Sequence, residues 1–183
     1  MDRRLVELAQ GGDRDAFAGL VHAVGDRLYA LAFRILRDPH LAQDAYQETL
    51  LTAWRQLPNL RDPDRFDAWT RQILVHACYA ESRRRTQWRT NVRVLELEES
   101  AFADAGHSVH DREQLEEAFA TLSIDQRAVF ALHHYLGVPL VEIASTLGIP
   151  AGTARSRLHY ATQAMRAAIE AADAGGTARE RTA

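Results

Sequence analysis

The sequence predicts an all-α fold of two small helical domains joined by a flexible acidic linker. Apolar residues recur at spacings of three and four over most of the chain, which is the period of an amphipathic helix. Almost no segment alternates with the period of two that a half-buried strand requires. A chain of 183 residues allows one domain or two small ones, and a hydrophobic content of 46% is enough for packed cores.

Three helices are predicted in the first half of the chain. The first begins at Asp13, a favourable N-cap residue, and we expect Asp38-Pro39 to end it, because the residue before a proline avoids the helical conformation. A second helix spans about residues 41–57 and a third about 66–84, separated by a polar, proline-bounded loop. Their predicted inward residues are Phe17, Leu20, Val21, Val24, Leu28, Leu31, Ala32 and Ile35, then Ala45, Leu50, Ala53, Trp54 and Leu57, then Trp69, Ile73, Leu74, Ala77 and Ala80.

The composition changes after residue 93. Residues 94–111 are rich in Asp and Glu, and 103–108 lack any packing pattern, so this segment is predicted to be a flexible linker. Helices are predicted again at about 112–121 and 125–136. The end of the chain, residues 174–183, is predicted to be disordered.

Residues 141–158 predict a short helix, a tight turn and a second helix. Gly148 tolerates the positive φ of a helix C-terminus, and Pro150 suits a first helical turn. We expect the second helix to bury one face, which consists of Ala154, Leu158, Ala161, Met165 and Ile169. Polar and basic residues occupy its other sides, the layout of a helix-turn-helix that inserts its second helix into the major groove. From this segment alone, an ordinary αα-hairpin remains an alternative.

Two separated blocks of motifs resemble those of bacterial RNA polymerase sigma factors of the extracytoplasmic-function (ECF) group. The first block of matching motifs comprises Arg-Ile-Leu-Arg-Asp-Pro at 34–39, Asp-Ala-Tyr-Gln-Glu-Thr at 44–49, Ala-Trp-Arg at 53–55, Phe-Asp-Ala-Trp at 66–69 and three arginines at 83–85. The second runs from Leu-Ser-Ile-Asp-Gln-Arg at 122–127 to Gly-Thr-Ala-Arg-Ser-Arg-Leu at 152–158. Together the blocks cover roughly residues 13–88 and 112–170.

The resemblance implies a domain plan and a function. Sigma region 2 would occupy residues 1–93, the linker 94–111, and sigma region 4 with its helix-turn-helix 112–173, before a disordered tail at 174–183. The protein would bind core RNA polymerase through the β′ clamp helices and the β flap, and direct it to promoter DNA. An anti-sigma factor would hold it inactive, and the protein itself would not be an enzyme.

Polymerase docking is expected on the predicted helix at 41–57. Asp44, Gln47, Glu48 and Arg55 are spaced so that most can share one face, with Tyr46 and Leu50 near an apolar centre. In the family, the matching acidic helix docks on the β′ clamp. By itself, the charge pattern favours a solvated polar face, and it is the family resemblance that favours docking.

Minus-ten recognition is expected from the loop at 57–65 and from the basic segment after it. The resemblance implies that this loop captures a base flipped from the non-template strand. Asn59 can offer a donor and an acceptor to a base edge, while Arg61 and Arg65 can reach phosphate. The segment with Arg83, Arg84, Arg85 and Trp88 combines positive charge with a possible stacking platform. A plain inter-helix connection and a solvated helix end are the respective alternatives.

Minus-thirty-five recognition is expected from the second helix of the helix-turn-helix. Its candidates are Thr153, Arg155, Ser156, Arg157 and His159, and His133 lies where some family members carry an arginine for the DNA backbone. Arg155 and Arg157 diverge by about 200° around the helix axis, so both cannot read bases. We predict that Arg155 reads a base edge, and that Arg157 holds phosphate or packs structurally. Tyr160 occupies a position that is often arginine in the family.

Other functional classes find little support in the sequence. We find no phosphate-binding glycine loop, no metalloprotease motif and no catalytic triad, and we expect no cofactor and no metal. Because no segment reaches transmembrane length, we expect a cytoplasmic protein without membrane insertion. Two alternatives stay open: a stand-alone helix-turn-helix regulator, and a sigma mimic that titrates an anti-sigma factor.

Overall fold

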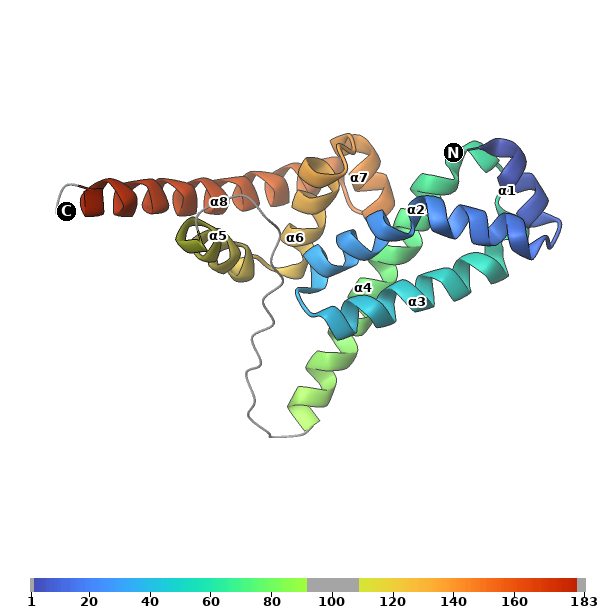
Figure 1. The fold of residues 1–183 in the computed structure, drawn as a ribbon, viewed down its shortest axis with the longest axis horizontal. Coiled ribbons are helices and arrows are strands. Elements are labelled where there is room, and N and C mark those ends of the chain that lie inside the picture. Colours follow the sequence, from blue (N-terminus) through green and yellow to red (C-terminus); the bar gives the residue numbers. More distant parts are fainter. Residues whose placement is uncertain (1, 92–108, 181–183) are drawn as a thin grey trace. The chain divides into compact units, whose positions relative to one another are not determined.

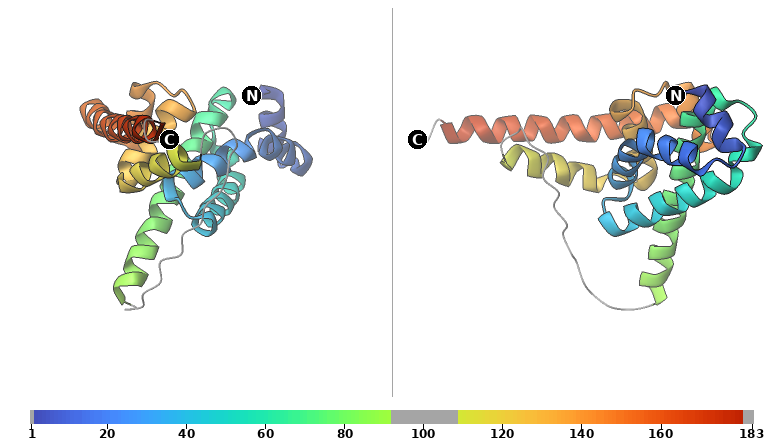
Figure 2. Two further views of the ribbon diagram at one scale, coloured as in Figure 1. Left: turned by 60° about the vertical axis from the view of Figure 1, so that its left-hand side comes forward. Right: turned by 45° about the vertical axis from the view of Figure 1, so that its right-hand side comes forward.

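The computed structural model describes residues 2–91 and 109–180, with side chains at 2–87 and 115–171. All regular elements in these ranges are helical, and the chain divides into two compact units, which are described separately (Figures 1 and 2). The fold class predicted from the sequence is therefore confirmed. Most of the predicted linker, 94–108, lies outside the described residues. No helix in the described part is long and apolar enough to cross a membrane.

The first unit contains four helices and two short 3₁₀ turns. They are α1 (Arg3–Gln10), α2 (Arg14–Leu36), α3 (Pro39–Gln56), η1 (Leu57–Asn59), η2 (Pro63–Arg65) and α4 (Phe66–Asn91). Helices α2, α3 and α4 pack on one another, and α1 packs on α2. The core between them is apolar, with Leu20, Leu31, Ile35, Phe66 and Leu74 almost fully buried. Helix α4 continues past its predicted end near residue 84.

The junction between α2 and α3 corrects the sequence-based assignment. Asp38-Pro39 begins α3 instead of ending the preceding helix, which already stops at Leu36. Arg37 adopts the left-handed conformation, with φ 56°, and turns the chain. The Asp38 carboxylate then accepts hydrogen bonds from the backbone N–H groups of His40 and Leu41. Pro39 stands in the first turn, where its missing N–H costs nothing.

Helix α1 was not predicted from the sequence. It has only eight residues, and the side chains it buries most fully are Val6 and Ala9, too few to form a visible stripe. Tertiary contacts hold it in place, because a helix this short is marginal in water. The Leu5 side chain lies against Gly19 of α2, where an added Cβ would come within 3.3 Å of it. Asp13 caps the following helix α2, as predicted.

The second unit contains the helix-turn-helix. Its elements are α5 (Val109–Thr121), α6 (Ile124–Phe130), a π-helical turn η3 (Ala131–Tyr135), α7 (Leu140–Leu147) and α8 (Ala151–Glu180). Helix α6 begins with a capping box in which Ser123 and Gln126 bond each other's backbone N–H. The helix predicted at 125–136 is thus an α-helix that widens into a π turn before Gly137, which has φ 66°.

The end of the chain differs from the prediction. Helix α8 continues to Glu180, although residues from 174 onward were expected to be disordered. The glycines at 175 and 176 weaken a helix by roughly 1 kcal/mol each, but alanines and other good helix formers surround them. Residues 181–183 lie outside the described range.

Helix α5 packs along α8 and begins a few residues before the predicted start at 112.

Candidate polymerase and DNA interfaces

The outer face of α3 presents acidic, basic and apolar side chains together. Asp44, Glu48, Leu51 and Arg55 fall within about 60° around the helix axis, at ~100° per residue, and all are exposed. Gln47 is exposed at the edge of this face. The opposite side of α3 is buried and small, with Ala42, Ala45, Thr49 and Ala53. Leu51, whose exposed fraction is 51%, is the apolar residue of the outer face, and sequence analysis missed it.

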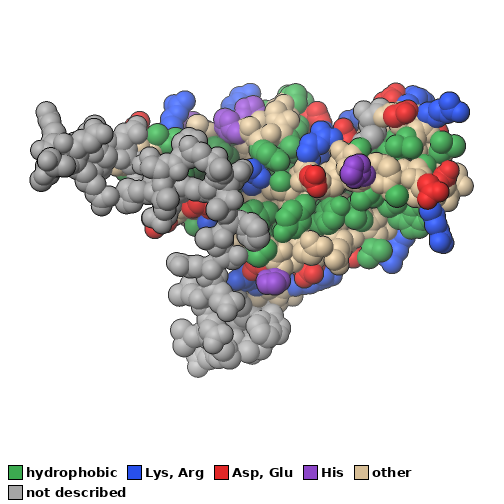
Figure 3. All heavy atoms as spheres, viewed as in Figure 1, with side chains coloured by type: hydrophobic (Ala, Val, Ile, Leu, Met, Phe, Trp, Pro, Cys, Tyr) green, Lys and Arg blue, Asp and Glu red, His purple; other side chains and the backbone are tan. Residues whose placement is uncertain are grey.

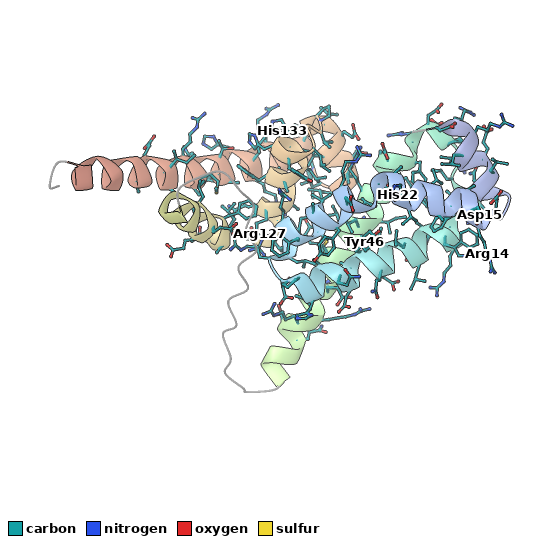
Figure 4. The ribbon with its side chains drawn as sticks, in the orientation of Figure 1. Arg14, Asp15, His22, Tyr46, Arg127 and His133 are labelled. Carbon is teal, nitrogen blue, oxygen red and sulfur yellow. The ribbon has the colours of Figure 1, made fainter. Side chains whose placement is uncertain are left out.

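Tyr46 lies on a different side of α3 from this outer face. Its ring packs edge-on against Tyr29 of α2, with ring centroids 6.2 Å apart (Figure 4). The hydroxyl fits against Gly25, where an added Cβ would lie 2.7 Å from the oxygen. Burial raises the pKa of Tyr46, and the charge of Asp26 raises it further. Tyr46 thus packs α3 onto α2, and Leu50, the other residue expected near the apolar centre, is half-buried on the same side. The exposed apolar residue of the outer face is Leu51.

The loop at 57–65 is built from the two 3₁₀ turns and presents its polar residues outward. Asn59, Arg61 and Arg65 are exposed, whereas Leu57 and Pro63 are buried and anchor the loop. Asp62 caps η2 by accepting a hydrogen bond from the backbone N–H of Asp64 at 3.1 Å. The structure therefore leaves all three candidate loop residues accessible to a ligand.

Both ends of helix α1 form hydrogen bonds with this loop. Gln10 Nε2 donates to the carbonyl oxygens of Leu57 at 3.1 Å and Leu60 at 2.7 Å. Arg3 Nη1 donates to Asp64 Oδ2 at 2.8 Å. Sequence analysis did not identify these contacts, because their partners lie about fifty to sixty residues apart in the chain.

The three arginines of α4 are exposed but differ in their partners. Arg84 pairs with Glu81 on its own helix, and Arg85 pairs with Asp38 at the start of α3, each at 2.5 Å. Arg83 forms no ion pair within the described part of the chain. The side chain of Trp88 lies outside the described side chains. Arg83 is therefore the arginine of this group most available to a phosphate.

The helix-turn-helix has the predicted turn geometry. Gly148 ends α7 with φ 63°, and Pro150 stands directly before α8, its carbonyl accepting a hydrogen bond from the N–H of Ala154. Ile143, Ala144 and Leu147 of α7 are buried, as are Ala154 and Ala161 of α8. Ile169 corrects the prediction: it was expected in the core, but 44% of it is exposed.

The N-terminal half of α8 presents a polar outer face. Arg155, Ser156 and His159 are exposed there, as predicted, and Ser156 Oγ donates to the Thr153 carbonyl at 3.0 Å. Thr153 itself is half-buried. Tyr160 also faces outward, with an exposed fraction of 61%. Arg155 forms no ion pair among the described residues, so its guanidinium is available to a ligand.

The side chain of Arg157 turns toward the protein and does not join the exposed face of α8. Its Nη2 bonds Asp125 Oδ2 at 2.8 Å, and only 25% of its side chain is exposed. Asp125 stands in the first turn of α6, so the pair connects the helix-turn-helix to the preceding helix. A structural role for Arg157 is therefore favoured over a base contact.

The two histidines of η3 also make internal contacts. His133 is half-buried, and its Nδ1 lies 3.1 Å from the carbonyl oxygen of Val138 (Figure 4). The His134 ring packs against Phe130, with centroids 4.5 Å apart, and burial, together with His133, lowers its pKa. Among the described residues, no group of three or more His, Cys, Asp and Glu side chains could hold a metal ion.

Charges of both signs are interspersed on the visible face of the first unit (Figure 3). This fits the formal net charge of −3 for the whole chain. Any attraction for DNA must come from local patches such as Arg83 and Arg155, and not from a field spread over the surface.

Comparisons with known proteins agree with this arrangement. Residues 20–90 match the Sigma-70 region 2 family and residues 112–165 the Sigma-70 region 4 family. The chain is 34% identical to the ECF RNA polymerase sigma factor SigL of Mycobacterium tuberculosis, over 87% of this chain and 94% of that protein. It is 29% identical to the RNA polymerase sigma-H factor of Pseudomonas aeruginosa, over 92% of this chain and 94% of that protein.

A solved structure shows the same likeness. The sigma factor RpoE of Bartonella quintana, crystallised with the anti-sigma factor NepR, superimposes with a TM-score of 0.74 at 25% identity, over 84% of this chain and 96% of that chain. The chain thus contains two sigma regions in the family's order. Its relatives match over nearly their whole length. The chain belongs to the ECF group of RNA polymerase sigma factors, the transcription initiation factors that direct the polymerase to promoters.

Proposed function

We propose that this sigma factor divides promoter recognition and polymerase docking among three surfaces. The outer face of α3 docks on core polymerase, the 57–65 loop reads the minus-ten element, and the start of α8 reads the minus-thirty-five element. One observation supports the proposal: each surface presents exposed polar side chains and lies within a segment that matches Sigma-70 region 2 or region 4.

Docking on the β′ clamp helices would centre on Leu51. An exposed leucine among Asp44, Glu48 and Arg55 gives the arrangement of an interface core with a polar rim. The charged pairs alone would contribute little, because exposed ion pairs are worth about 0–1 kcal/mol. The second unit would dock on the β flap.

Recognition of the minus-ten element would use the exposed loop residues. A base that leaves the stack loses a few kcal/mol of stacking and pairing, which the loop must offset by contacts to the base edge. Asn59 can make such contacts, while Arg61 and Arg65 neutralise nearby phosphates. Arg83 would continue the backbone contacts along α4.

Recognition of the minus-thirty-five element would use α8. Arg155 is placed to read guanine by a bidentate contact, and Ser156 and His159 extend the same exposed surface. The N–H groups at the start of the helix, near Thr153, favour a phosphate. Arg157 and His133 would support this surface from behind through Asp125 and Val138.

Regulation would come from an anti-sigma factor. Two solved structures that resemble this chain are complexes with such proteins, RpoE with NepR and CnrH with the cytosolic domain of CnrY. The sigma factor would work in the cytoplasm and contribute binding surfaces only, because the polymerase carries out the chemistry.

Run-off transcription with core polymerase and a genomic promoter library tests the proposal. We expect initiation at a discrete set of promoters that share two elements. DNA binding without core polymerase, and no initiation with it, would favour a stand-alone regulator. Tight binding to an anti-sigma protein, with neither DNA binding nor initiation, would favour a sigma mimic.

A further inference from the structure

Helix α1 joins both ends of the 57–65 loop to the helical core. We propose that α1, and Gln10 above all, is the positioning element that fixes this loop in the shape needed to capture a base. The inference rests on the proposed function of the loop. It concerns residues 3–10, which precede the family's region 2 match at 20–90.

Gln10 holds the backbone on both sides of Asn59. Its side-chain amide donates to the carbonyls of Leu57 and Leu60, in a partly buried setting. The N–H of Leu60 also donates to the Leu57 carbonyl, at 3.0 Å. The Leu57 carbonyl therefore accepts one hydrogen bond from the backbone of its own turn and one from the Gln10 side chain. A carbonyl that loses its donor away from water carries a desolvation cost, so Gln10 favours this one loop conformation over alternatives.

Arg3 adds a second, weaker attachment at the far end of the loop. Its guanidinium bonds Asp64 and Glu7, each at 2.8 Å, and so links α1 to η2. The side chains of Arg3 and Asp64 are 55% and 59% exposed, which leaves this pair open to screening by salt. Arg61 lies between the two attachments, with its own side chain exposed.

Helix α1 is itself capped and packed against α2, as a positioning element must be. Asp2 caps its first turn by accepting from the N–H of Arg4 at 2.9 Å. Val6 is fully buried, and Gly12 turns the chain into α2 with φ 92°, a conformation that L side chains rarely adopt. The position of the loop relative to α2 is therefore set through α1.

The test compares Gln10→Met with Arg4→Met in holoenzyme made with core polymerase. Methionine keeps the length and helix propensity of glutamine but has no N–H donor. Arg4 is exposed on the same helix, and its side chain makes no hydrogen bond or ion pair among the described residues. Run-off transcription is measured on promoters that carry each base at each minus-ten position, and 2-aminopurine fluorescence reports base extrusion.

For Gln10→Met, we expect discrimination at the captured base to fall roughly two- to tenfold, the range for a lost neutral hydrogen bond. Core polymerase binding and minus-thirty-five preference should stay unchanged, and Arg4→Met should match the parent. Gln10→Lys, which restores a donor of similar reach, should recover part of the discrimination. Amide hydrogen exchange across 57–65 in the free chain should quicken in Gln10→Met, because the loop opens locally.

Two results would overturn the inference. One is parental discrimination and parental loop exchange in Gln10→Met. The other is a loss of activity equal on every promoter, which would mean that Gln10 contributes only stability. Failure of the proposed function looks different: the parental holoenzyme itself would show no preference at any minus-ten position, while the exchange experiment would still report whether Gln10 orders the loop.

Discussion

Two arginines two positions apart on α8 have opposite surroundings. Arg155 is exposed and forms no ion pair among the described residues, whereas Arg157 is paired with Asp125. Helical geometry alone separates their directions by about 200°, and this much could be predicted from the sequence. The partner of Arg157 could not, because Asp125 belongs to another helix, 32 residues away.

Replacing each arginine should therefore have a different effect on promoter choice. Arg155→Ala should relax preference at one minus-thirty-five position, by roughly 1–3 kcal/mol, through loss of a base contact. Arg157→Ala should weaken recognition evenly, because it loosens the seating of α8. Selection from a randomised promoter pool measures both profiles, with Asp125→Asn as the control expected to resemble Arg157→Ala. A base-specific loss in Arg157→Ala and none in Arg155→Ala would reverse the assignment.

Cys78 should be chemically inert in the folded protein. The side chain is fully buried in α4, and burial raises the pKa of its thiol to about 12. The reactive thiolate is therefore scarce at neutral pH, and it becomes abundant only as the pH rises toward this pKa. We expect a disulfide reagent at about pH 8, near the normal thiol pKa, to react much more slowly with native than with urea-unfolded protein. Equal rates in the two states would contradict this.

Among the elements, α3 shows most clearly what a periodic pattern can and cannot reveal. The spacing of Asp44, Glu48 and Arg55 predicted a common exposed face, and the structure confirms that these residues share one. The pattern did not reveal which apolar residue joins them. Tyr46 packs on Tyr29 instead, while Leu51 is exposed. The sequence could not reveal this difference, because it does not say which side of α3 the neighbouring helix α2 covers.

Reversing the charges of this face should impair docking without unfolding the helix. Asp44→Arg with Glu48→Arg should weaken core polymerase binding by at least tenfold, about 1.4 kcal/mol or more, because like charges would then meet across the interface. Fluorescence titration with core polymerase measures the affinity, and circular dichroism checks helicity. Glu117→Arg with Glu170→Arg, two exposed sites on other helices, is the matched control. Parental affinity in the α3 variant would disprove the docking assignment.

Short elements and helix ends were the parts least predictable from sequence. Helix α1 buries few residues, and the signals at Asp38-Pro39 serve equally well to stop one helix or to start another. The linker prediction falls largely outside the described residues, and the tail prediction gave way to a longer α8. The long helices were predictable because each carries a stripe of apolar residues over several turns.

At the scale of the whole molecule, the charge balance limits what the free protein can do. The net charge is −3, and several arginines of the candidate surfaces are occupied by internal partners, among them Arg84, Arg85 and Arg157. Few positive groups therefore remain to neutralise phosphates.

The isolated chain should bind promoter duplex poorly. We expect dissociation constants no tighter than about micromolar at physiological salt, the range of non-specific binding. Specific, tight binding should appear only when core polymerase is added. Fluorescence anisotropy with labelled promoter and a scrambled control measures both cases. Nanomolar binding by the free chain would contradict the expectation.

Asp38 carries two duties on one carboxylate. One oxygen caps α3 through the N–H groups of His40 and Leu41, and the other holds Arg85 of α4. Asparagine, serine or threonine could supply the cap but no negative charge, whereas glutamate could supply the charge but caps poorly. Only aspartate meets both demands, so any replacement of Asp38 weakens either the start of α3 or its link to α4 unless position 85 changes as well.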